Sequence, residues 1–202
     1  YNCRFTGWQD TIFNGDPMTC NMKKLMLPDF FQASEVPIVH KFYRNYFKDC
    51  YVCGDVDYIF GPNTAFFDHC EIHSIARVSE EKAYITAAST PAGQEFGLIF
   101  SHCRITGEEP DSVYLGRPWR DCAKTAFICC ELGDHICPEG WQNWGKVRAE
   151  VLSDYIEYGN FGPGADCSGR SPLSRCLVNP EVETYFSKEN VLVGEDGWIP
   201  AE

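Results

Sequence analysis

The most regular pattern in the sequence is a cysteine followed two positions later by an apolar residue. Residues two apart point to the same face of a β-strand, so each copy predicts a short strand with both side chains turned toward a core. The five copies are Cys3 with Phe5, Cys50 with Val52, Cys70 with Ile72, Cys103 with Ile105, and Cys130 with Leu132.

A second apolar position precedes this pattern and breaks its alternation. Four of the cysteines have a phenylalanine three positions earlier: Phe47, Phe67, Phe100 and Phe127. An odd spacing cannot keep both side chains on one face of a straight strand, so a bend is expected between them. The residues just before the cysteines are Asn2, Asp49, His69, His102 and Cys129. Asn, Asp and His tolerate left-handed backbone better than most residues, which favours a bend there.

The spacing of the copies predicts the architecture. Successive cysteines lie 47, 20, 33 and 27 residues apart, and repeats of this length are typical of solenoids. Strand-rich coils with variable loops favour an all-β fold, a parallel β-helix in which equivalent residues stack in columns. The alternative is a β-sandwich in which the cysteine spacing is a coincidence.

The first two coils match beyond the cysteine. Residues 3–13 and 50–60 share cysteine, glycine, aspartate, isoleucine and phenylalanine at the same offsets. If these coils are neighbours, Asp10 lies directly over Asp57, with the strands about 4.8 Å apart. Two carboxylates this close should not ionise equally, so one pKa is expected to rise and the other to stay low. For either aspartate alone, a role as a turn or cap residue would be favoured; the paired register shifts the balance toward a catalytic pair.

The long gap between these coils contains an insertion, residues 14–41, with Pro17, Pro28 and Pro37. Long loops on solenoids often form the walls of a binding site. The insertion is therefore interpreted either as such a wall or as a tolerated surface loop.

Composition limits the classes of function. The chain has 202 residues, which suits one domain over 1–202, and a formal net charge of −12 without a basic patch. We therefore expect no nucleic-acid binding, and no apolar run reaches the roughly 18 residues of a membrane span. The first residues, Tyr1-Asn2-Cys3-Arg4, read like the middle of a domain, so the natural N-terminus is expected to be missing.

The remaining cysteines and the histidines suggest one disulfide and no metal site. Cys167 and Cys176 flank a Gly/Ser/Pro-rich loop and are predicted to form a disulfide, while Cys122 with Cys137 is a weaker candidate pair. Cys50 and Cys53 have metal-like spacing but no second pair, so no metal or cofactor is expected. His69 and His73 are interpreted as bend and surface residues.

The end of the chain changes character. Asn179-Pro180-Glu181 is typical of a helix start, which predicts a short capping helix over 179–188. Val182, Tyr185 and Phe186 would face the solenoid.

Three ordered motifs give the sequence a family resemblance. Residues 7–12, 54–61 and 114–119 read GWQDTI, GDVDYIFG and YLGRPW, and residues 83–91 and 138–141 support them. Together they resemble the signatures of the pectin methylesterases, from about Cys3 to Trp198 with the insertion excepted. The resemblance implies a right-handed parallel β-helix that demethylates homogalacturonan without metal or cofactor.

The same resemblance implies a role for each residue of the site. Asp57 would be the nucleophile, and Asp10 the general acid and then the base. Gln9 would stabilise the oxyanion, and Arg117 would hold Asp57 ionised and oriented. Trp119, Tyr58 and Phe60 would contact the sugar. An earlier glutamine of the family's oxyanion site lies on a coil that precedes this sequence.

Other readings of the same features remain. A β-helix glycosidase of the polygalacturonase type also uses paired carboxylates, although Gln9 and the motif around Arg117 favour the esterase. A non-catalytic pectin-binding solenoid is the third possibility. The resemblance further implies a secreted, monomeric protein of the cell wall, with pectin as substrate and a proteinaceous inhibitor as a possible partner. The absence of a Gly-x-Ser-x-Gly motif argues against a serine esterase.

Overall fold

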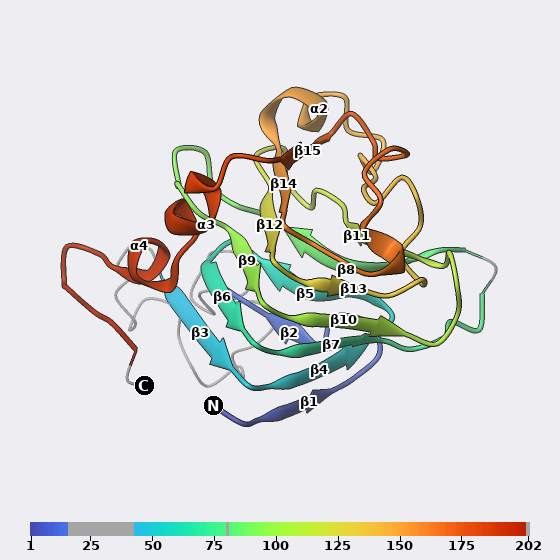
Figure 1. Ribbon diagram of the computed structural model, residues 1–202, viewed down its shortest axis with the longest axis horizontal. Helices are drawn as coiled ribbons and strands as arrows, with labels where there is room; N and C mark the ends of the chain where they lie inside the picture. The colour runs from blue at the N-terminus through green and yellow to red at the C-terminus, as the bar shows by residue number, and fades with distance from the viewer. Residues whose placement is uncertain (16–42, 80, 201–202) are drawn as a thin grey trace, which may run out of the picture.

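The protein is a stack of coils made from three parallel β-sheets (Figure 1). The computed structural model describes residues 1–15, 43–79 and 81–200, so the insertion beyond Gly15, including Cys20, lies outside the described residues. Each coil runs along sheet 3, turns sharply into sheet 1, and continues into sheet 2. The predicted parallel β-helix is confirmed.

Sheet 1 consists of β1 (Arg4–Thr6), β4 (Tyr51–Gly54), β7 (Glu71–Ser74), β10 (Arg104–Gly107) and β13 (Glu131–Leu132). Sheet 2 consists of β2 (Ile12–Phe13), β5 (Val56–Gly61), β8 (Ala83–Ala88) and β11 (Val113–Gly116). Sheet 3 consists of β3 (Arg44–Lys48), β6 (Thr64–Asp68), β9 (Leu98–Ser101), β12 (Lys124–Ile128), β14 (Asp154–Tyr158) and β15 (Ser174–Leu177). Short helical segments are α2 (Ala149–Leu152), the 3-10 turn η1 (Pro163–Ala165), α3 (Glu181–Tyr185) and α4 (Lys188–Leu192).

The predicted bend forms the corner between sheet 3 and sheet 1. Its residues have left-handed backbone, with φ between 52° and 53° at Asp49, His69, His102 and Cys129. The turn lets the phenylalanine and the cysteine of one coil both point inward despite their odd spacing. Side chains at equivalent positions then stack along the helix, as the sequence repeat predicts.

The interior columns supply the core. The rings of Phe47, Phe67, Phe100 and Phe127 stack with centroids 4.5 to 4.7 Å apart. Cys50, Cys70, Cys103 and Cys130 are buried beside them as free thiols. Cys3 is exposed, which corrects the expectation for that residue, because among the described residues no coil covers its outer side. Phe67, Phe100 and Phe127 are fully buried, which contributes roughly 2–3 kcal/mol for each ring, and Phe47 at the edge of sheet 3 is partly buried.

The C-terminal segment and the disulfides can be compared with the sequence predictions. Cys167 and Cys176 form the predicted disulfide, whereas Cys122 and Cys137 are free thiols, so the second pairing is wrong. The expected single helix over 179–188 is instead α3 followed by α4, because Ser187 interrupts it and accepts a hydrogen bond from the Asn190 N–H.

The side chains of α3 and of the residue after it have the orientation that the sequence predicts. Val182 and Phe186 are buried against sheet 3. The Tyr185 ring lies 5.2 Å from Phe96 and its hydroxyl donates to Glu95 over 3.1 Å, so it also faces the solenoid with 44% of the residue exposed. The helices of the described chain are all too short to cross a membrane.

A buried histidine makes the stability of the fold depend on pH. His135 is 1% exposed, and neither ring nitrogen has a hydrogen-bond partner in the described part of the chain. Burial lowers the pKa of His135 from 6.5 to about 4. Between these values the unfolded chain binds a proton that the folded chain does not, so stability rises with pH across this window.

The expected result is a loss of up to about 3 kcal/mol in the free energy of unfolding between pH 7 and pH 4 from this group alone. The replacement His135→Gln should flatten that slope. Urea unfolding at several pH values measures it, and parallel curves for the two proteins would contradict the assignment.

Candidate active site

The two aspartates that the repeat aligned do lie on neighbouring coils of sheet 2. β2 and β5 pair Ile12 with Ile59, and the Asp10 N–H donates to the Val56 carbonyl over 3.1 Å. The register therefore places Asp10 over Asp57. Both residues have left-handed backbone, with φ of 58° and 50°. This conformation is uncommon outside glycine but tolerated by aspartate, and it often occurs at functional sites.

A β-bulge directs Asp57 outward. The pairing of β5 with β8 shifts between Val56 and Ile59, so that Asp57 and Tyr58 together occupy the space of one residue on β8. Tyr58 consequently turns inward, where it is fully buried and its hydroxyl lies 2.9 Å from Ser74 Oγ. The sequence prediction of Tyr58 as a sugar contact is wrong for this reason.

Arg117 clamps the Asp57 carboxylate with a planar fork. Arg117 Nε donates to Oδ1 over 2.9 Å and Nη2 donates to Oδ2 over 2.8 Å. The side chains of Asp57 and Arg117 are only 8% and 16% exposed. A two-point contact between charged groups is among the strongest hydrogen-bond arrangements, and it fixes the orientation of the carboxylate.

Aromatic rings hold the guanidinium in turn. The Arg117 Cζ lies 3.9 Å from the ring centre of Tyr84 and 3.8 Å from that of Trp144. Its backbone N–H donates to the Thr86 carbonyl over 3.0 Å, which fixes the segment after β11 to sheet 2. Cation–π contacts on both faces leave Arg117 little freedom to move away from Asp57.

Both carboxyl groups have raised pKa values. For Asp57, burial raises the pKa, and the hydrogen bonds and charge of Arg117 only partly oppose it. For Asp10, burial and then the negative charge of Asp57 raise the pKa, and Arg117 lowers it. The predicted split, with one value raised and one low, is wrong, because burial of the Asp57 carboxyl group raises its pKa more than Arg117 lowers it.

Further residues of the site were not singled out from the sequence. Lys146 Nζ donates to the Pro118 carbonyl over 2.8 Å and lies 4.1 Å from the Trp144 ring centre, and its charge lowers the pKa of Asp57. Tyr84 could have been found by aligning it with Tyr114, since their rings stack at 5.2 Å on neighbouring coils. Trp144 lies in an irregular loop with φ of 55°, where no periodic signal exists.

The aromatic surface beside the carboxylates comes from three segments. The Phe60 ring lies 5.0 Å from Phe13 and 5.6 Å from Trp119, all three half-buried. Gln9 is exposed next to Asp10 on the neighbouring coil. The site therefore combines a buried, oriented carboxylate, an exposed carboxyl group with a raised pKa, an adjacent amide and flat apolar rings. Such a set can supply a nucleophile, a proton donor and a sugar-binding surface.

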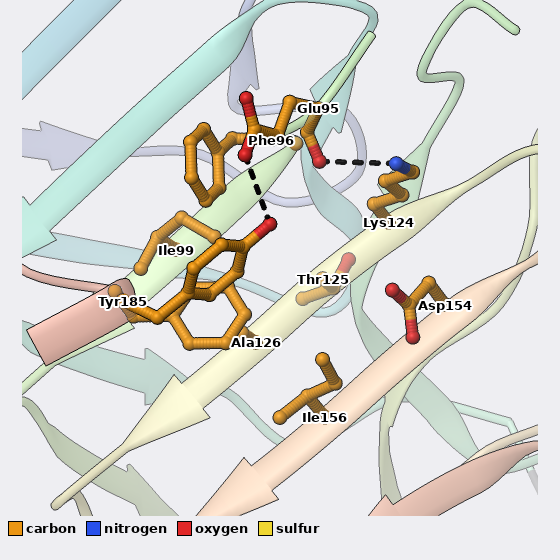
Figure 2. Close-up of a pocket in the computed structure, with 11 residues that line it drawn as sticks. Glu95, Phe96, Ile99, Lys124, Thr125, Ala126, Asp154, Ile156 and Tyr185 are labelled. Carbon is orange, nitrogen blue, oxygen red and sulfur yellow. Dashed lines mark hydrogen bonds between the residues drawn. The ribbon is translucent and has the colours of Figure 1, made fainter. Parts of the chain in front are cut away.

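Two other features of the described residues lie apart from this site. None of the clusters of potential metal ligands found there includes Asp10 or Asp57. A crevice of about 20 Å³ lies on sheet 3, lined by residues such as Glu95, Thr125 and Tyr185 (Figure 2). That volume suits about one water molecule and cannot hold a sugar.

Comparisons with known proteins agree with this geometry. The sequence model of the pectinesterase family matches residues 32–195. Pectinesterase 31 of Arabidopsis thaliana is 36% identical over 90% of this chain and 48% of its own length. Putative pectinesterase 11 of the same plant is 33% identical over 98% of this chain and 47% of its own length. The chain thus spans about half the length of these curated relatives.

Solved structures show the same fold. Pectin methylesterase from carrot superposes with a TM-score of 0.76 and 25% identity, covering 96% of this chain and 56% of its own. Deglycosylated pectin methylesterase from Aspergillus niger gives 0.69 and 29%, covering 98% and 55%.

Proposed function

The chain belongs to the pectinesterase family, and from that premise we propose that it hydrolyses C6 methyl esters of homogalacturonan to methanol and de-esterified pectin. The observation that carries the proposal is the buried Asp57 carboxylate, which accepts one hydrogen bond from Arg117 Nε and one from Arg117 Nη2. A solved pectin methylesterase with a hexasaccharide in its complex, 25% identical, shares the fold with a TM-score of 0.70.

In the proposed first step, a carboxylate oxygen of Asp57 attacks the ester carbonyl carbon. The Asp10 carboxyl group gives its proton to the departing methoxide, so that methanol leaves and an anhydride joins Asp57 to the sugar. The Gln9 amide is proposed to donate to the oxyanion that forms on the carbonyl oxygen. The raised pKa of Asp10 suits a group that must be protonated at this stage.

In the second step, Asp10 is a carboxylate and takes a proton from water, whose oxygen attacks the anhydride. The anhydride opens, Asp57 leaves as a carboxylate and Asp10 is protonated again. The new galacturonic acid then gives its proton to solvent. The nearby charges of Arg117 and Lys146 lower the pKa of Asp57, which favours its return as a carboxylate. Phe60 and Trp119 are proposed to pack on the sugar rings beside the reacting ester.

The test is to measure methanol and reducing ends released from highly methylated pectin by the full chain. An esterase releases methanol with no new reducing ends, whereas a polygalacturonase-type glycosidase releases reducing ends. Binding to pectin with neither product would indicate a non-catalytic solenoid and would contradict the proposal.

The cellular setting is part of the same proposal. A secreted protein of the cell wall would retain the Cys167–Cys176 disulfide, since such bonds persist in oxidising compartments. We propose that the protein acts there as a monomer. Some relatives carry a pectinesterase inhibitor in their names, which supports a proteinaceous inhibitor as a partner.

The pairing with Arg117 predicts a shift in the pH profile. The nucleophile must be ionised, so kcat/KM should fall as pH falls through the pKa of Asp57. Arg117 lowers that pKa. The replacement Arg117→Gln should therefore move the acidic limb of the profile to higher pH, in addition to reducing the rate.

The matched control is Arg120→Gln, because Arg120 is exposed and contacts Trp119 rather than Asp57. Initial rates of methanol release between acidic and neutral pH measure both profiles. An unchanged acidic limb in the Arg117 variant would show that the pair does not control ionisation of the nucleophile.

A further inference from the structure

The corner between sheets 3 and 1 forms a column of polar side chains away from the catalytic pair. β9 and β12 pair Ser101 with Ile128, and the next residues, His102 and Cys129, occupy the corner of neighbouring coils. Both have a φ of 53°. Because equivalent positions repeat about every 4.8 Å, their side chains leave the corner side by side. The stacked rings of His69 and His102, 5.2 Å apart, continue the column.

An acidic side chain from α3 reaches the same corner. His102 Nε2 lies 3.8 Å from Glu183 Oε1, and the donor atoms of His102, Cys129 and Glu183 are all within 4.8 Å of one another. Zinc–ligand bonds of 2.0–2.3 Å in a tetrahedron put neighbouring ligand atoms roughly 3.4–3.7 Å apart. The observed separations need only small side-chain adjustments to meet this geometry.

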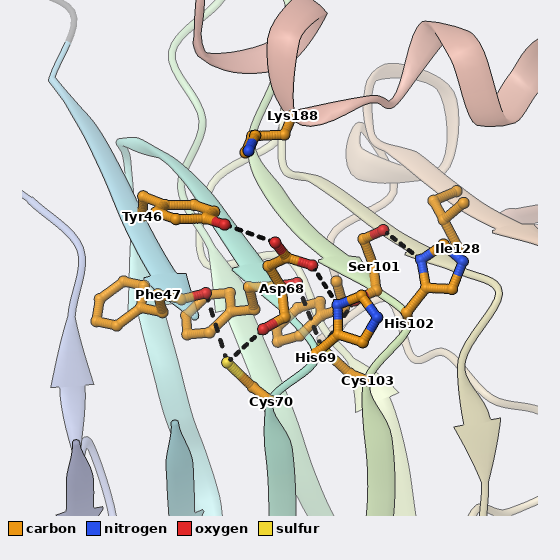
Figure 3. A network of polar contacts seen from close by, with 12 residues as sticks. Tyr46, Phe47, Asp68, His69, Cys70, Ser101, His102, Cys103, Ile128 and Lys188 are labelled. Atoms are coloured by element: carbon orange, nitrogen blue, oxygen red, sulfur yellow. Dashed lines mark hydrogen bonds and ion pairs between the residues drawn. The ribbon is translucent and has the colours of Figure 1, made fainter. Parts of the chain in front are cut away.

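The histidine is already oriented for metal binding. Ser101 Oγ lies 3.0 Å from His102 Nδ1 (Figure 3). Donation from Nδ1–H to this hydroxyl leaves the Nε2 lone pair facing Glu183. Histidine ligands of metals commonly have their second nitrogen held by such a partner, which fixes the ring and its tautomer. His69 is held in the same way by Asp68, at 2.6 Å.

In the other two clusters of potential metal ligands among the described residues, the ligand groups already bind other partners. Cys167 and Cys176, near Glu157, are joined in the disulfide. In the cluster of Asp111, Cys137 and Glu139, the Lys82 ammonium lies 2.8 Å from Asp111 and 3.9 Å from Glu139. Cys129, by contrast, is a free thiol at a partly exposed position.

We propose that His102, Cys129 and Glu183 bind a zinc ion that fastens α3 to the corner of the solenoid. A nitrogen, a thiolate sulfur and a carboxylate oxygen form a ligand set typical of Zn²⁺, whereas Mg²⁺ and Ca²⁺ select oxygen ligands. Because the side chains of His102 and Glu183 are 43% and 53% exposed, water is proposed as the fourth ligand. Sequence spacing gave no hint of this site, because its ligands come from two coils and a helix. The proposal is independent of the esterase activity.

The test uses the full chain, reduced and freed of metal with a chelator. Titration with Co²⁺, a spectroscopic substitute for Zn²⁺, should give one equivalent of binding and a thiolate-to-metal charge-transfer band. Cys129→Ser should abolish the band, and Cys122→Ser, which removes another partly exposed thiol, should keep it.

Competition with Zn²⁺ then gives its affinity. His102→Gln and Glu183→Gln should each weaken it at least about tenfold, since loss of outer partners alone can cost that much. The matched control is His73→Gln: His73 and Glu108 form a similar pair at 3.7 Å but belong to no ligand cluster with a thiol.

A thermal shift provides the second readout. Zn²⁺, but not Mg²⁺, should raise the Tm of the native chain by mass action, and the same Zn²⁺ concentration should raise the Tm of Glu183→Gln less. Absence of the charge-transfer band in the native chain, or native Zn²⁺ affinity in Cys129→Ser, would overturn the proposal.

Discussion

Replacing Asp57 by asparagine is expected to lower the kcat for methanol release at least about a thousandfold, the scale on which loss of a nucleophile acts in other covalent hydrolases. An amide at this position cannot attack the ester to form the anhydride. Asparagine is the appropriate replacement because it tolerates the left-handed backbone at φ of 50° and keeps the shape of the side chain. Alanine would add backbone strain and obscure the chemical effect.

The matched control for this variant is Asp55→Asn, two residues earlier. The Asp55 carboxylate accepts from the Val56 N–H over 2.7 Å and does not contact Arg117 through any hydrogen bond in the described residues. It should keep most of the activity. Circular dichroism and the Tm show whether each variant is folded. A folded Asp57→Asn protein with native turnover would remove Asp57 from the proposed mechanism.

The parts of the fold that depend on periodicity could be predicted from the sequence. Stacked coils place like residues in like positions. The cysteine column, the phenylalanine column and the left-handed corner therefore each appear in the sequence as a repeat. The same repeat predicts the stacking of Asp10 over Asp57 without any family resemblance. Columns are detectable because each coil must satisfy the same local packing.

The parts of the site built by loops could not be predicted in this way. Trp144 covers Arg117 from an irregular segment, and the position of Lys146 depends on that loop. The inward turn of Tyr58 results from a bulge, and a single inserted residue leaves no period to detect. The pKa of Asp57 depends on its burial and on the nearby charges of Arg117 and Lys146, so its direction could not be predicted from spacing alone.

A buried ion pair at the last coils is the other position where one substitution should have a large effect. Glu157 on β14 points into the core and is 2% exposed. Arg170 Nε and Nη2 donate to its two oxygens over 2.8 and 3.0 Å, and Trp141 Nε1 donates over 3.0 Å. Glu157→Gln is expected to lower the free energy of unfolding by about 3–5 kcal/mol, because it leaves the arginine charge buried without its partner.

Strand β14 contains a matched control for this prediction. Asp154, three residues earlier, also pairs with an arginine, at 2.6 Å from Arg175, but these side chains are 36% and 59% exposed. Asp154→Asn should cost less than about 1 kcal/mol, because water screens an exposed pair. Urea unfolding at neutral pH measures both variants. Equal losses would show that burial does not set the strength of the Glu157 pair.

Removing both charges separates the ion pair from the other bonds of Arg170. A buried pair can often be replaced by apolar residues at little cost, so Glu157→Leu with Arg170→Met should be more stable than Glu157→Gln alone. Recovery should nevertheless be incomplete. Arg170 also donates to the carbonyls of Pro138 and Gly164, over 3.0 and 2.6 Å, and these acceptors would lose their donor. Full recovery would mean that neither the ion pair nor the carbonyl contacts of Arg170 contribute net stability.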